Sequence, residues 1–78
     1  MGGKPASIIN SVRIARKTAG FSQVELGKKV GVTRQTILTI EAQRYPPSLE
    51  LAFRLSYVLD MKIEDLFVFK PEWLTKDL

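Results

Sequence analysis

The sequence predicts a small all-α domain of five short helices. Three observations favour this fold class: apolar residues recur at intervals of three and four, capping side chains precede several periodic stretches, and glycine or proline separates them. A chain of 78 residues has room for one core, and its 45% hydrophobic and 26% charged residues are ordinary for a folded domain. We expect this domain over residues 8–69, between a flexible N-terminus (1–7) and a C-terminal tail (70–78).

The first helix is predicted over roughly residues 8–19. Its apolar stripe follows steps of four, three and four and consists of Ile8, Val12, Ala15 and Ala19. Gly20 is placed to end this helix in a left-handed cap.

The second and third helices are predicted to follow one another closely. Ser22 and Glu25 have the spacing of a capping box, which starts a helix over residues 23–30. Gly31 interrupts that helix, and Thr33 can cap the next one, whose buried residues are Ile37 and Ile40.

The fourth helix follows a loop at Pro46 and Pro47, because paired prolines remove two amide donors and disfavour helix at the residues before them. Ser48 can cap it. Its broad apolar face consists of Leu49, Leu51, Ala52, Leu55, Val58 and Leu59. A turn at residues 60–62 leads to a last helical piece over residues 63–67.

The second and third helices together have the pattern of a helix-turn-helix unit. Gly27 allows the two helices to cross closely, and Gly31 permits the tight turn between them. The exposed start of the third helix then carries Thr33, Arg34, Gln35 and Thr36, with Thr39 one turn on. Arginine and glutamine suit bidentate contacts with guanine and adenine edges in the major groove of DNA. The alternative is that these are ordinary solvent-facing helix residues.

Charge is distributed unevenly along the chain. Eight basic and two acidic residues up to Arg44 give +6, whereas four basic and six acidic residues from Tyr45 onward give −2. A basic half is typical of a surface that binds a polyanion, with a solvated basic surface as the other interpretation.

The composition argues against several functional classes. The absence of cysteine and histidine removes disulfides, thiolate metal sites and the commonest general base, so we expect no catalytic residues, no metal and no cofactor. The first seven residues lack an apolar stretch, and no segment approaches the roughly 20 apolar residues that span a bilayer. We expect a cytoplasmic protein that is not an enzyme and has neither a membrane partner nor a small-molecule ligand.

The sequence also resembles a known family. The residues that carry the resemblance are the run 21–37, Glu41 and the run 47–52. They are similar to the Cro and phage-repressor family of five-helix, lambda-repressor-like DNA-binding domains, in particular its small bacterial and archaeal members. The resemblance implies a sequence-specific transcriptional regulator, expected to be a repressor, that inserts its third helix into the major groove of double-stranded DNA.

The resemblance also implies roles for single residues. Gln23 matches a phosphate contact, Thr33 and Thr36 match contacts to phosphate or a thymine methyl group, and the base-contacting positions are Arg34, Gln35 and Thr39. Arg16 and Glu41 match an ion pair that joins the first helix to the third. Two departures stand out: Gly27 replaces the usual alanine, and Ala42-Gln43-Arg44 replaces an Asn-Gly-Lys-type turn, which leaves Arg44 to meet a phosphate.

We expect a homodimer, because one recognition helix covers too few base pairs to single out a site. The interface is predicted at Phe67, Val68, Phe69 and Trp73, with short tail strands pairing across the axis and Phe53 or Tyr57 beneath. A rival account folds this segment back over its own helices. A rival function is that of an antitoxin or adaptor whose main partner is a protein. It would need a longer partner-binding tail than the residues after Val68 provide.

Overall fold

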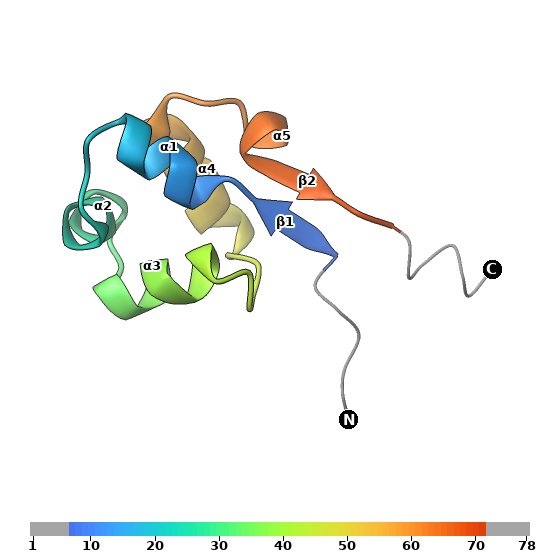
Figure 1. Cartoon of the computed structure of the whole chain (residues 1–78), viewed down its shortest axis with the longest axis horizontal. Coiled ribbons are helices and arrows are strands. Elements are labelled where there is room, and N and C mark those ends of the chain that lie inside the picture. The colour runs from blue at the N-terminus through green and yellow to red at the C-terminus, as the bar shows by residue number, and fades with distance from the viewer. Residues whose placement is uncertain (1–6, 72–78) are drawn as a thin grey trace.

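The computed structural model describes residues 7–71. In this range the chain forms five helices and a two-stranded sheet (Figure 1). The elements in chain order are β1 (Ile8–Asn10), α1 (Val12–Thr18), α2 (Gln23–Val30), α3 (Arg34–Glu41), α4 (Leu49–Leu59), α5 (Ile63–Leu66) and β2 (Phe67–Phe69). The five predicted helices are confirmed, but a purely all-α class is wrong because β1 and β2 pair antiparallel.

The helices enclose one small core. α2 packs against α3 and α4, and α1 lies against α3 and α4. The side chains with the least exposure are apolar and come from all five helices: Val12, Leu26, Val30, Ile37, Leu55 and Leu66. No helix within residues 7–71 is long and apolar enough to cross a membrane.

Side-chain caps fix where the middle helices begin. The Ser22 hydroxyl accepts from the Glu25 main-chain N–H at 3.0 Å, and Glu25 Oε1 accepts from the Ser22 N–H at 2.7 Å, which completes the capping box. Thr33 and Ser48 cap α3 and α4 through their hydroxyl oxygens, which accept from the main-chain N–H groups of Thr36 and Leu51. The predicted starts of these three helices are therefore confirmed.

The predicted start of the first helix is wrong. Residues 8–10 form strand β1, and the helix begins only at Val12. Ile8 and Ile9 are β-branched, which suits a strand, and they pair with Phe69 and Val68 of β2. The stripe from Ile8 onward fits helical spacing, yet pairing with a distant segment decides the local structure.

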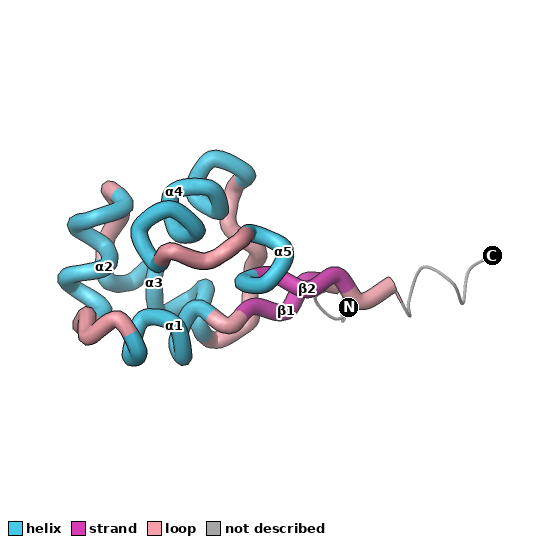
Figure 2. The backbone as a smooth tube through the Cα atoms, turned by 90° about the horizontal axis from the view of Figure 1, so that it is seen from above, coloured by secondary structure: helices cyan, strands magenta, loops and turns pink. Residues whose placement is uncertain are grey.

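The sheet returns the end of the described chain to its beginning. Helix α5 ends at Leu66, and Phe67–Phe69 continues directly as β2 instead of one more helical residue. Figure 2 shows the sheet at one end of the helical body, beside α5. Residues 67–69 thus fold back onto their own chain, but against strand β1 and not over the helices as the rival account supposed, whereas Trp73 lies outside the described residues.

Candidate nucleic-acid interface

Helices α2 and α3 meet across a turn with very little space. Gly31 adopts φ 80°, in the left-handed region that favours glycine, and the Val32 N–H donates to the Gly27 carbonyl at 2.9 Å. A Cβ atom at Gly27 would lie 2.7 Å from the Val32 carbonyl oxygen. The main chain itself therefore occupies the space of a side chain at position 27, which explains why glycine stands there.

The first turn of α3 presents polar side chains to solvent. Arg34 and Gln35 are exposed, as is the capping residue Thr33, whereas Thr36 and Thr39 are half-buried. The Thr39 hydroxyl donates to the Gln35 carbonyl at 3.0 Å, so this hydroxyl is held against its own helix. Arg34 and Gln35 are thus exposed planar groups: the guanidinium offers donors only, and the carboxamide offers two donor hydrogens and an acceptor oxygen.

A buried ion pair holds α1 to the end of α3. Arg16 Nε donates to Glu41 Oε2 at 2.6 Å, and Arg16 Nη2 donates to Glu41 Oε1 at 3.2 Å. The two side chains are 9% and 4% exposed. The hydrogen bond to Glu41 raises the pKa of Arg16 above its ordinary value, against the opposing effect of burial. Arg16 Nη1 also donates to the Phe21 carbonyl at 2.9 Å, so the guanidinium braces the segment before α2 as well.

Gln23 belongs to the same network. Its Nε2 donates to Glu41 Oε1 at 3.2 Å, so the first residue of α2 is oriented by the last residue of α3. The family resemblance implied the pair of Arg16 and Glu41 but not this third member, and a glutamine at a helix start has no periodic signature that would reveal such a contact. The network thus connects the start of α2 to the end of α3.

The turn after α3 carries Gln43 and Arg44. Arg44 is exposed, and its N–H donates to the Thr39 carbonyl at 3.3 Å, which keeps it close to the helix end. Gln43 adopts φ 62°, a conformation that residues other than glycine rarely take. Sequence reasoning treated this segment only as an altered turn and missed the inward-facing Gln43.

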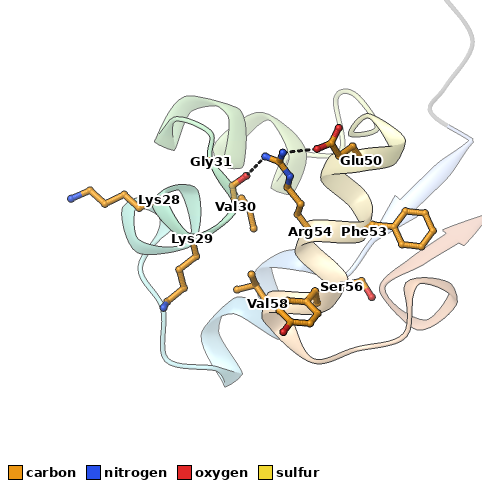
Figure 3. Close-up of a pocket in the computed structure, with 10 residues that line it drawn as sticks. Lys28, Lys29, Val30, Gly31, Glu50, Phe53, Arg54, Ser56 and Val58 are labelled. Atoms are coloured by element: carbon orange, nitrogen blue, oxygen red, sulfur yellow. Dashed lines mark hydrogen bonds and ion pairs between the residues drawn. The ribbon is translucent and has the colours of Figure 1, made fainter.

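A shallow groove lies between α2 and α4 (Figure 3). Arg54 spans it, because Nη1 donates to the Val30 carbonyl at 3.1 Å while Nη2 pairs with Glu50 at 2.5 Å. On α4, Leu49, Phe53 and Tyr57 recur at intervals of four and are 72%, 56% and 88% exposed. This apolar stripe has no partner among the described residues.

Comparison with known proteins identifies consistent relatives. The family described as Helix-turn-helix matches residues 12–66. A protein of Archaeoglobus fulgidus named as an uncharacterized HTH-type transcriptional regulator is 48% identical over 63 residues, covering 81% of this chain and 90% of the relative. The similarly named YgzD of Bacillus subtilis is 46% identical over 63 residues, covering 81% and 96%. The crystal structure of the restriction-modification controller protein C.AhdI from Aeromonas hydrophila has a TM-score of 0.64 at 26% identity, covering 69% of this chain and 78% of that one.

Proposed function

The chain belongs to the helix-turn-helix family of transcriptional regulators of the Cro and phage-repressor type, and we propose that it is a repressor that reads a short operator in double-stranded DNA. The observation that carries the proposal is the exposed Arg34-Gln35 step, which follows the tight turn that Gly27 and Gly31 permit. On this proposal the protein acts in the cytoplasm, without catalysis and without a small-molecule effector.

Base recognition falls to the exposed face of α3. Arg34 can donate two hydrogen bonds to the O6 and N7 atoms of guanine, and Gln35 can pair with N6 and N7 of adenine. Thr39 lies one turn further along the same face and adds a methyl group or a hydroxyl acceptor. The support for this assignment is the exposure of Arg34 and Gln35 at the start of the helix.

Phosphate contacts surround this face. Gln23 stands at the first turn of α2, where main-chain amides favour an anion, and its carboxamide keeps a donor hydrogen beyond the one given to Glu41. Thr33 and Thr36 can contribute hydroxyl groups, and Arg44 a charge, at the two ends of α3. These contacts fix the position of the helix in the groove but carry no base preference.

We also propose that the chain binds as a homodimer through β2. The bonds Lys70 N–H to Ser7 O and Ser11 N–H to Leu66 O flank the sheet, so the main-chain groups of Phe69 point away from β1. An outer strand edge of this kind can pair with its own copy across a two-fold axis. Val68 and Phe69 are 48% and 56% exposed and, with Phe67, would supply the apolar contact. Trp73 remains part of this proposed interface.

The alternative is an antitoxin or adaptor whose main partner is a protein. The α4 stripe of Leu49, Phe53 and Tyr57 favours it, since scattered exposed apolar residues are common but an aligned row of three is less so. A gene for a binding partner beside this one would support the alternative.

Selection of bound fragments from a random duplex pool tests the proposal. The expected product is an inverted repeat with half-sites about 34 Å apart, one helical turn. Enrichment of a single half-site would contradict the dimer alone. Failure to enrich any sequence, with the chain folded by circular dichroism, would contradict the proposed repressor function.

A further inference from the structure

The side chain of Gln43 connects the end of α3 to strand β1. Its Oε1 accepts from the Asn10 main-chain N–H at 3.0 Å and from Asn10 Nδ2 at 3.2 Å, while its Nε2 donates to the Asn10 carbonyl at 2.9 Å. Asn10 Nδ2 also donates to the carbonyl of Ile40 in α3 at 2.9 Å. Four hydrogen bonds thus join two segments that are 30 and 33 residues apart in sequence.

The Gln43 amide takes the place of a neighbouring strand. Asn10 is opposite Phe67 in the sheet, and the flanking bonds at Ser7 and Ser11 show that the main-chain groups of Asn10 point away from β2. Gln43 satisfies both of these groups with one planar amide. One edge of the sheet is thereby bonded to the end of α3, and the other edge, on β2, has no strand partner within residues 7–71.

We propose that Asn10 and Gln43 form a clamp that fixes the orientation of α3 relative to β2, and thereby sets the spacing between half-sites that the protein accepts. This inference rests on the proposed function, in which β2 joins the two copies. In that dimer, the clamp on each side is the hydrogen-bonded connection between the recognition helix and the sheet, in addition to the packing of α3 and β2 on the common core. Gln43 is then a positioning residue, which touches no base.

The spacing of half-sites is sensitive to such a link. Each added base pair moves a half-site by about 3.4 Å and rotates it by about 35° around the duplex axis. A rigid connection between α3 and β2 rejects that change, whereas a loose one accommodates it. The backbone of Gln43 is held at φ 62° and its side chain is half-buried, so clamp and turn are ordered together.

The test compares operators whose half-sites are one base pair closer, at the selected distance, or one base pair further apart. Gln43→Gly removes the amide but accommodates a positive φ, so the turn is kept. We expect the full parent chain to prefer the selected spacing by about tenfold, a margin similar to that of one mismatched base pair, and the variant by about threefold or less. Base preference within each half-site and dimer association measured by sedimentation stay unchanged.

Two further variants make the outcome decisive. Asn10→Ser keeps an oxygen that can accept from the Val12 N–H, as Asn10 Oδ1 does at 3.1 Å, but cannot reach Ile40, and it should relax the spacing in the same direction. Arg44→Ala, in the same turn as Gln43, should weaken binding equally at every spacing.

Unchanged spacing preference in folded Gln43→Gly and Asn10→Ser would overturn the clamp and leave these residues a merely stabilising role. If Gln43→Gly does not fold, Gln43→Asn replaces it, because asparagine tolerates a positive φ while its shorter side chain loses the reach to the Asn10 main chain; an unchanged spacing preference in that variant would overturn the clamp. A parent chain that is monomeric on its operator would instead overturn the proposed dimer, and the spacing role with it. The variants therefore test the clamp, and the parent chain tests the dimer.

Discussion

Replacement of Glu41 by glutamine should destabilise the fold strongly, because it leaves a buried guanidinium without its counter-charge. Arg16 is 7% exposed and makes two of its three described hydrogen bonds to Glu41. Breaking one partner of a buried pair costs about 3–5 kcal/mol. The remaining bond to the Phe21 carbonyl places the expected loss near the lower end, about 3 kcal/mol. For a domain of this size, that loss lowers Tm by about 12–24 °C.

Urea unfolding followed by circular dichroism at 222 nm measures this loss, and an unchanged m-value ensures that the two curves are comparable. Glu50→Gln is the matched control, since it breaks the pair with Arg54, whose side chains are 51% and 74% exposed, and should cost no more than about 0.5 kcal/mol. The double variant Arg16→Met/Glu41→Leu should recover much of the stability, because no buried charge remains. A loss for Glu41→Gln below about 1 kcal/mol would refute the reasoning.

Three other properties follow from the same structure. Gly27→Ala should lower the free energy of unfolding by about 1 kcal/mol despite the better helix propensity of alanine, since its Cβ would lie 2.7 Å from the Val32 carbonyl; a gain in Tm would show that the turn can yield. Main-chain and hydroxyl hydrogen bonds from Ser22 lower the pKa of Glu25, so its stabilising effect is complete at neutral pH and is lost as pH falls through that lowered pKa. Glu25→Gln should thus lose less stability than the parent between about pH 5 and pH 3 in thermal melts, and equal losses would contradict the cap. Affinity for DNA should fall steeply with salt, with a log-log slope of about −0.9 for each neutralised phosphate, and a slope near zero would exclude the basic half as the binding surface.

The sequence predicted the middle of the fold well because its signals there are local. Ser22, Thr33 and Ser48 each accept a hydrogen bond from the N–H group three residues further along, at the start of the helix they cap. Gly31 ends α2 because glycine readily adopts the positive φ found there. The first helix was predicted too long because the partner of Ile8 is Phe69, at the far end of the domain. Local periodicity contains no information about such a pairing.

In the candidate site, too, the positions that depend on local structure were predictable and those that depend on distant contacts were not. Exposure of Arg34 and Gln35 follows from helix geometry once Ile37 and Ile40 are known to face the core, so their position was predictable. The contacts of Gln43 with Asn10 were not, because they depend on a positive φ and on a strand whose existence was itself unforeseen. Hydrogen bonds of this kind between a glutamine side chain and a distant strand can be recognised only in the folded structure.

DNA-binding measurements with the variants Arg34→Ala and Gln35→Ala test most directly the central claim, that α3 reads the operator. Each variant is titrated against the selected operator and against operators changed at single base pairs. We expect each to lose about 1–3 kcal/mol on the operator and to become indifferent to one base pair, while Gln23→Ala weakens all duplexes alike. If the Arg34 and Gln35 variants bind the operator as tightly as the parent chain and keep every base preference, α3 is not the helix that reads the DNA.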